Sequence, residues 1–340
     1  MGKRREASGY SLVIGVDKPA GMTSHDVVDR IRRIYGERRV GHTGTLDPAA
    51  TGALAVCVGP ATRLDRFLVG HRKEYEFTVV FGAATDTDDA QGRVIEQLPV
   101  PVSVGNEAAV RAYLDSQLGT QHQRPPAYSA IKVNGKKSYA EARRGNVIEL
   151  ALRPIEIYKL DLVGFEQTED MVSWCVRAEV SAGTYVRSIA RDAGLAFGTC
   201  AHVGSLRRLR SGSLAVEDCL TLDEIERNPH TSALDPLTLL NRRILFARDG
   251  QANDVAHGRP LVIDNRQLVA FDAHTIGAYN SSCTSGFFPD ETPVFAGEQI
   301  GIVADNKLIA IYEYDASRAV FKSACGFATG VNRGFDIYRR

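Results

Sequence analysis

The chain has 340 residues, enough for one large domain and a small one, and 44% of its residues are hydrophobic, an ordinary fraction for a globular protein. Its 41 basic and 41 acidic residues cancel, so net charge alone does not indicate a nucleic-acid partner, although the first 73 residues carry 13 basic and 7 acidic side chains. No apolar run approaches the ~20 residues of a membrane span, and the six cysteines form no C-x-x-C pair, which disfavours a membrane protein, a zinc site and a disulfide framework.

The start of the chain is basic, and its first apolar run, residues 12–14, is too short for the apolar region of a secretion signal. We therefore expect residues 1–10 to form a basic tail on a cytoplasmic protein. Residues 11–16 then predict a strand. Apolar residues at helical spacing follow from 27 to 34, with Ser24 as the expected N-cap and Gly36 as the end of the helix.

Residues 41–52 cannot form a regular helix or a central strand, because they contain three glycines and Pro48. They predict a shaped loop that presents a single acidic residue, Asp47. An Asp before a Pro is most often a turn residue, so this pair alone is weak evidence for catalysis. Residues 53–58 predict a buried strand, and residues 62–68 a short helix.

The middle of the chain mixes strands and helices without strict alternation. Residues 73–81 alternate between apolar and polar and predict a strand, and residues 85–92 an acidic turn-rich loop. The remaining patterns predict helices over 107–118, 139–144 and 185–197, and strands over 147–152, 155–165 and 171–180. This order predicts an α+β fold rather than strictly alternating βαβ units.

A break near residues 228–232 separates the last third of the chain. Beyond it, short apolar runs at 261–263, 268–271, 300–303 and 308–312 predict a small β-rich domain. Residues 273–297 fit none of these runs and are interpreted as an insertion.

Six motifs together resemble the TruB family of tRNA pseudouridine synthases. They occur in the family's order and cover about two thirds of the chain. The first two are the segment 17–24 and the loop 41–52. The others are Lys73-Glu74-Tyr75 with Thr85-Asp86-Thr87-Asp88, then Pro126-Ala127-Tyr128-Ser129-Ala130-Ile131-Lys132, then Gly183-Thr184-Tyr185-Val186-Arg187, with His202-Val203 and Leu206-Arg207-Arg208 closing the set.

The resemblance implies a pseudouridine synthase catalytic domain over residues 11–235, with a mixed, largely antiparallel sheet flanked by helices. It also implies a small β-rich PUA-like domain over 240–340. It implies isomerisation of uridine to pseudouridine at position 55 in the T-loop of tRNA, after the base is flipped out of the loop. The reaction loses no electrons or groups, so no cofactor or metal is expected. The sequence also contains neither a G-x-G-x-x-G nor a G-x-x-x-x-G-K-[ST] nucleotide-binding loop.

Three residues are the expected catalytic groups under this resemblance. Asp47 is the nucleophile, and its carboxyl is ionised at neutral pH. Arg187 is its bidentate partner; the alternative is an ordinary arginine on a helix surface. Tyr75 is a wall of the base pocket and a possible participant in proton transfer; the alternative is a core tyrosine on a strand.

Four further residues are expected to bind substrate. His42 would stabilise the flipped-out nucleotide, and Tyr185 would be a second pocket wall or a core residue. Lys18 would contact a phosphate or have a structural role, and Leu206 would line the pocket or belong to the core. The basic clusters at 136–137, 143–144 and 207–210 predict phosphate contacts or merely solvated faces.

The expected partner is tRNA, bound through its T-arm by a monomer that needs no obligate protein partner. Two other hypotheses stay open. One is an RNA-binding or tRNA-folding protein in which catalysis is secondary. The other is a guide-RNA-dependent relative that works inside a multi-protein particle.

Overall fold

The computed structural model describes residues 8–129, 131–133, 135–142, 144–146, 148, 150–168, 171–231, 233–270, 288–290 and 292–334. Contacts divide the chain into two compact units. Unit 1 comprises the described residues of 1–47, 53–69 and 212–340, and unit 2 those of 48–52 and 70–211. This division places both ends of the chain in unit 1. The domain boundary expected near residues 235–240 was based on a change in the composition of the sequence, and it stays a prediction.

Unit 2 is built on five antiparallel strands in the order β12-β4-β11-β10-β7. In chain order their bounds are β4 Lys73–Phe81, β7 Gly119–Gln123, β10 Arg153–Gln167, β11 Val172–Val180 and β12 Ala201–Ser211. Every second residue of β4 from Lys73 to Phe81 is buried, which confirms the alternation expected there.

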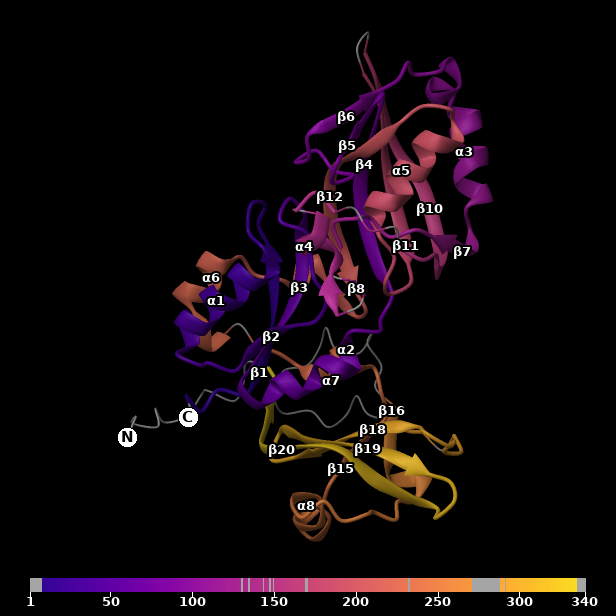
Figure 1. Cartoon of the computed structure of the whole chain (residues 1–340). Coiled ribbons are helices and arrows are strands. Elements are labelled where there is room, and N and C mark those ends of the chain that lie inside the picture. Colours follow the sequence, from indigo (N-terminus) through magenta and orange to yellow (C-terminus); the bar gives the residue numbers. More distant parts are fainter. Residues whose placement is uncertain are drawn as a thin grey trace. The chain divides into compact units, whose positions relative to one another are not determined.

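Helices α3 (Glu107–Ser116) and α5 (Val186–Ala196) lie against these strands (Figure 1). The core between them is aromatic. The fully buried ring of Trp174 lies 4.3 Å from that of Phe81, 5.3 Å from that of Phe197 and 6.3 Å from that of Tyr113, measured between centroids. Its indole N–H donates to the carbonyl of Val104, so burying this polar atom leaves no hydrogen bond unmade.

Gly52 allows two strands to approach closely. It lies in β3 (Thr51–Val58), whose first two residues pair in parallel with Arg207 and Arg208 of β12. A Cβ at position 52 would lie 2.2 Å from the carbonyl oxygen of Arg208, and the φ of 104° also favours glycine. The last glycine of the loop motif is therefore required by packing.

We expect Gly52→Ala to lower the free energy of unfolding by at least about 2 kcal/mol, because the clash and the strained φ add. Urea unfolding monitored by circular dichroism measures the change. Gly70→Ala is the matched control, since a Cβ there meets nothing within 4 Å and its φ lies outside the left-handed region. Equal midpoints for the two variants would contradict the packing argument.

The first part of unit 1 contains β1 (Leu12–Lys18), followed by α1 (Ser24–Tyr35) and β2 (Val40–His42). β14 (Ala233–Leu234) pairs antiparallel with β1, and β2 pairs antiparallel with the end of β3. The 3₁₀ segment Gly59–Leu64 and α2 (Asp65–Leu68) occupy the expected short helix, and α6 (Leu222–Arg227) and α7 (Pro236–Leu240) follow later in the chain.

The N-cap of α1 is Thr23, so the expectation of Ser24 was wrong by one residue. Thr23 forms a capping box with Asp26, in which each side chain bonds the other residue's backbone N–H. Gly36 ends the helix at a φ of 60°, as expected. Because Thr23 caps the helix, the Ser24 hydroxyl is available to bond Leu46 instead.

A separate six-stranded sheet follows, in the order β17-β16-β15-β18-β19-β20. Its strands are β15 Ile244–Phe246, β16 Leu268–Ala270, β17 Phe288–Pro289, β18 Gln299–Ala304, β19 Lys307–Asp315 and β20 Val320–Asn332. Helix α8 (Asp249–Ala256) contributes Val255 to the core of this sheet. The mixed α+β fold with a small β-rich C-terminal part is thereby confirmed, while most of the expected insertion at 273–297 lies outside the described residues.

The long strand β20 returns to the start of the chain within unit 1. The N–H of Asn332 donates to the carbonyl of Ser11 at 2.8 Å, and Arg333 binds the carboxylate of Asp235 at 2.7 Å. Arg63 and Arg66 donate to carbonyls in the middle of β20. The C-terminal sheet is thus fastened to the residue before β1 and to other parts of unit 1, and removing it would also remove these bonds.

One strand assignment from the sequence was wrong. The described residues of 147–152 form no strand, and β10 begins only at Arg153. Conversely, β12 was not expected, because the arginines within it hide the alternation. Unit 2 also contains short elements: the strands β5 Ala83–Thr85, β6 Val94–Gln97, β8 Lys132–Val133 and β9 Lys136–Lys137, the helix α4 Ser138–Ala142, and the 3₁₀ turn Val102–Gly105.

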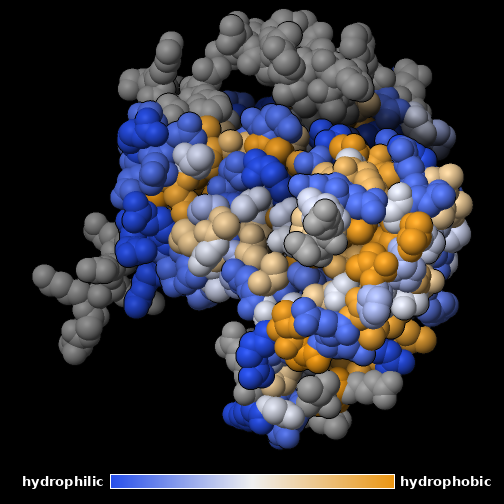
Figure 2. Space-filling model, turned by 90° about the horizontal axis from the view of Figure 1, so that it is seen from above, coloured by the Kyte–Doolittle hydropathy of each residue, from blue (hydrophilic) through white to orange (hydrophobic). Residues whose placement is uncertain are grey.

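Hydrophobic and hydrophilic residues are interspersed on the face seen in Figure 2. Exposed apolar side chains scattered in this way are normal on protein surfaces. Among the described residues, no helix combines the length and apolar character that crossing a membrane requires.

Candidate active site

The loop that carries Asp47 is anchored one residue earlier, at Leu46. The backbone N–H of Leu46 donates to the hydroxyl of Ser24 at 2.8 Å, and this hydroxyl donates to the carbonyl of Leu46 at 3.1 Å. Both residues are buried, so the first turn of α1 fixes the backbone next to Asp47. The Asp47 side chain itself is half-buried. The backbone beside Asp47 is thus held in place, while the residue itself stays partly exposed.

His42 ends β2 at the start of the same loop, and it is also half-buried. Lys18, by contrast, is fully buried. Its ammonium donates to the carbonyls of Pro19 at 2.8 Å and Met22 at 2.6 Å, and so holds the turn that leads into α1. These bonds support the structural alternative for Lys18, while its contact with substrate remains a prediction.

Tyr75 lies on the buried face of β4, between Ala178 of β11 and Arg208 of β12. The residue is 7% exposed, which agrees with a core position. Lys73 lies two residues earlier on the same face. Burial, and secondarily the Arg208 cation, lower the pKa of Lys73 to about 8.

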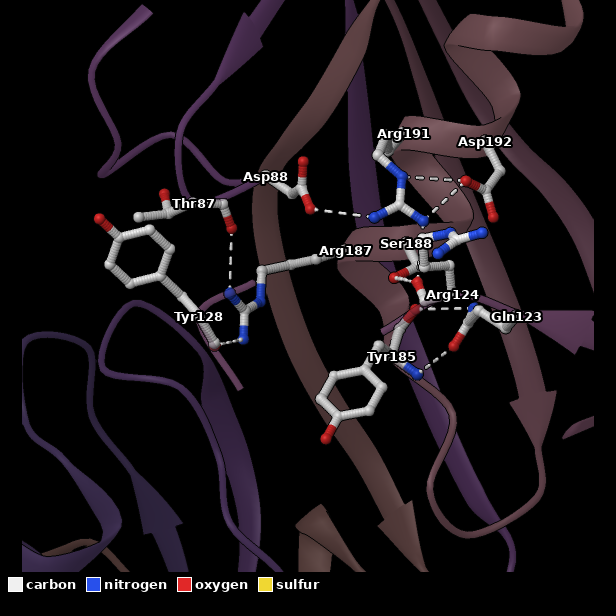
Figure 3. Close-up of polar contacts among 10 residues, drawn as sticks. All are labelled: Thr87, Asp88, Gln123, Arg124, Tyr128, Tyr185, Arg187, Ser188, Arg191 and Asp192. Atoms are coloured by element: carbon white, nitrogen blue, oxygen red, sulfur yellow. Dashed lines mark hydrogen bonds and ion pairs between the residues drawn. The ribbon is translucent and has the colours of Figure 1, made fainter. Parts of the chain in front are cut away.

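Arg187 is buried in unit 2, so the alternative of a helix-surface arginine was wrong. It belongs to the first turn of α5, and its guanidinium donates to two backbone carbonyls (Figure 3). Nη1 bonds the carbonyl of Thr87 at 3.0 Å, and Nη2 bonds that of Tyr128 at 3.1 Å. Thr87 belongs to the third motif, Tyr128 to the fourth and Arg187 to the fifth, so Arg187 ties three motifs together.

The backbone of Tyr185, just before α5, is held by the side-chain amide of Gln123. The Tyr185 N–H donates to Oε1 at 2.8 Å, and Nε2 donates to the Tyr185 carbonyl at 3.1 Å. In Figure 3 the tyrosine ring projects away from Gln123, and the side chain is half-buried. This amide fixes where α5 begins, and hence where Arg187 lies.

Leu206 is half-buried on β12, opposite Phe77 of β4. Phe77 and Tyr75 share one face of β4, so unit 2 places Leu206 and Tyr75 on neighbouring strands. The predicted residues are therefore divided between the units, with Lys18, His42 and Asp47 in unit 1 and Tyr75, Tyr185, Arg187 and Leu206 in unit 2.

Of the basic residues expected to contact phosphate, Arg208 is fully buried and is unsuited to that role. Arg207 is half-buried and donates to the hydroxyl of Thr51 at 3.3 Å. Arg144 is exposed and paired with Glu141 at 2.9 Å, and Arg143 lies outside the described residues.

Several contacts around α5 were missed at the sequence level. Ser188 donates to the carbonyl of Arg124 at 2.8 Å, and Arg191 lies 3.3 Å from the carboxylate of Asp88. The only signals were that Asp88 belongs to a motif and that Arg191 follows Arg187 by four residues, one helical turn. Within the described parts of the chain, no three His, Cys, Asp or Glu side chains gather to form a metal site.

Comparison with protein families matches residues 32–186 to the N-terminal domain of the TruB family pseudouridylate synthases. Residues 187–245 match the C-terminal domain of tRNA pseudouridylate synthase B. A tRNA pseudouridine synthase B from Thermobifida fusca is 43% identical over 250 residues, which cover 72% of this chain and 85% of that protein. The chain belongs to the TruB family.

A second TruB-family relative, a tRNA pseudouridine synthase B from Geobacillus kaustophilus, is 43% identical over 236 residues, covering 69% of this chain and 82% of its own. The chain is therefore an enzyme, an isomerase of the tRNA pseudouridine synthase class. A chain in the crystal structure of a Cbf5-Nop10-Gar1 complex aligns over 96% of this chain and 85% of its own length, with a TM-score of 0.63. At 22% identity it shows a shared fold alone.

Proposed function

We propose that this TruB-family enzyme converts the uridine at position 55, in the T-loop of tRNA, to pseudouridine. The observation that carries the proposal is the buried Arg187, which binds the third and fourth motifs from the helix of the fifth. These motifs thus build one arrangement within unit 2 rather than recurring by chance. The choice of tRNA rests on relatives named tRNA pseudouridine synthase B at 41–43% identity.

The reaction is an isomerisation in which atoms balance without a co-reactant. The bond between the sugar C1′ and the uracil N1 breaks, the base turns, and a bond forms between C1′ and C5. The proton on C5 is then lost, and N1 gains one. A base inside a folded loop must first be extruded, and an RNA-shape surface with a closed base site serves this step.

Three residues have proposed roles in these steps. Asp47 is the nucleophile, since a carboxylate needs no separate base for activation. Arg187 keeps that carboxylate ionised and oriented once water is excluded. Tyr75 stacks on the uracil and assists proton transfer. We further propose that His42, Lys18, Tyr185 and Leu206 position the nucleotide.

We propose a cytoplasmic monomer that needs no protein partner, cofactor or metal. The particle-bound hypothesis is supported only by a likeness in fold, whereas the relatives at 41–43% identity are named tRNA pseudouridine synthase B. A tRNA-folding role beside catalysis stays open, because binding without turnover would use the same RNA surface.

The purified full-length protein should modify an unmodified tRNA transcript at position 55 with nothing else added. Turnover should persist in EDTA, with spermidine to keep the tRNA folded, because the spacing of cysteine and histidine offers no metal site. Release of tritium from 5-³H-uridine measures the rate, and carbodiimide mapping locates the product.

A tRNA with cytidine at position 55 is the control and should remain unmodified. Modification at another position, or a requirement for a guide RNA or further proteins, would overturn the proposal. Binding that restores tRNA folding without any tritium release would favour the chaperone hypothesis instead.

A further inference from the structure

Two arginines lie one turn apart on α5 and reach the same acidic loop. Arg187 donates to the backbone carbonyl of Thr87 at 3.0 Å. Arg191, four residues later, approaches the carboxylate of the next residue, Asp88, at 3.3 Å. Residues i and i+4 share one face of a helix, so both guanidinium groups extend from the same side of α5 (Figure 3). The loop is thus held at two consecutive residues.

The same two arginines also hold a second segment. Arg187 donates to the carbonyl of Tyr128 at 3.1 Å, and Arg191 donates to that of Arg124 at 2.9 Å. The hydroxyl of Ser188 shares the Arg124 carbonyl at 2.8 Å. Each arginine therefore bridges the same two segments, residues 87–88 and residues 124–128.

The backbone of Asp88 has an uncommon conformation and is held by two hydrogen bonds. Its φ of 61° is uncommon for a residue with a side chain. Its N–H donates to the carbonyl of Thr85 at 3.2 Å, and its own carbonyl accepts from the N–H of Val203 at 3.1 Å. The peptide that carries the Thr87 carbonyl precedes this residue, so a change in the backbone of Asp88 moves the acceptor that Arg187 uses.

The pair between Asp88 and Arg191 is largely shielded from water, with side chains 18% and 24% exposed. Burial raises the pKa of the Asp88 carboxyl, and the cations of Arg191 and Arg187 counter that rise. Removing Arg191 would leave a shielded carboxylate without its nearest cation, which is costly, and the loop would rearrange.

We propose that Arg191, through Asp88, is a positioning residue that aligns the Arg187 guanidinium for the chemical step. The inference rests on the proposed function and deepens it, because it assigns the orientation of a catalytic group to Arg191, a residue outside the motifs, acting through Asp88. Arg191 is not a catalytic residue in this account, since it acts on the reaction only through Arg187.

The test uses Asp88→Asn, Arg191→Gln and the double variant of the full-length enzyme. Enzyme in excess over 5-³H-uridine tRNA gives the single-turnover rate at saturation, and filter binding gives the tRNA affinity. We expect each single variant to lose about 10- to 100-fold in rate, the cost of a misplaced catalytic group, with affinity within about threefold of wild type. The double variant should be no slower than the slower single variant, because both remove one shared contact.

Asp192→Asn is the matched control. Asp192 accepts from the other side of the Arg191 guanidinium at 2.9–3.0 Å but does not touch the acidic loop (Figure 3). Its variant should keep the wild-type rate. A loss equal to that of Asp88→Asn, or multiplicative losses in the double variant, would overturn the proposal.

Thermal unfolding of each variant separates positioning from general damage. If Arg191→Gln does not fold, Asp88→Asn and Arg191→Lys decide the question, and Arg191→Lys should retain an intermediate rate because it keeps the charge. Unchanged rates in both would overturn the inference. A wild-type enzyme that leaves tRNA unmodified would instead overturn the proposed function.

Discussion

Replacing Asp47 by asparagine is expected to abolish pseudouridine formation while tRNA affinity stays within about threefold of wild type. The amide keeps the size of the carboxyl but is not a nucleophile, and loss of a nucleophile costs at least about 10³-fold in rate. The backbone beside it should not move, because Ser24 holds Leu46 from both its N–H and its carbonyl. Tritium release with enzyme in excess measures the rate.

The matched control is Asp29→Asn, on the exposed side of α1, where the carboxylate pairs with Arg32 at 2.7 Å. A surface pair of this kind contributes little, so this variant should react like wild type. Product formation by Asp47→Asn at more than a few per cent of the wild-type rate would remove Asp47 from the nucleophile's role.

Arg187→Lys should slow the single-turnover rate by roughly 100-fold, although the charge is kept. An ammonium lacks the planar fork with which Arg187 reaches the carbonyls of Thr87 and Tyr128 while keeping donors for a carboxylate. One buried carbonyl then loses its donor, which should also lower the free energy of unfolding by about 1–3 kcal/mol. Single-turnover kinetics and urea unfolding measure the two effects separately.

Arg111→Lys is the control for this exchange, because Arg111 lies on the surface of α3, paired with Glu107 at 2.7 Å. Both its rate and its unfolding midpoint should match wild type. If Arg187→Lys reacted at the wild-type rate but unfolded more easily, Arg187 would be a structural residue that joins the motifs without taking part in the reaction.

Elements whose residues interact locally could be predicted from the sequence. The alternation of 73–81 fixed the length of β4, because a strand buried on one face needs apolar residues at every second position. The apolar stripe and Gly36 fixed the extent of α1, and only its cap was misplaced by one residue. Strand β12 escaped prediction because Arg208 occupies a buried position, where periodicity expects an apolar side chain.

For the site, the sequence by itself determined the family and the candidate residues, since the order and spacing of the motifs are properties of the chain. Only the tertiary structure decided what surrounds those residues. Lys18 and Arg187 look like surface cations in sequence, yet both are buried and bonded to backbone carbonyls. Gln123 contacts Tyr185 across 62 residues. The two carbonyls that accept from Arg187 lie 100 and 59 residues away along the chain, so no local pattern of residues encodes these contacts.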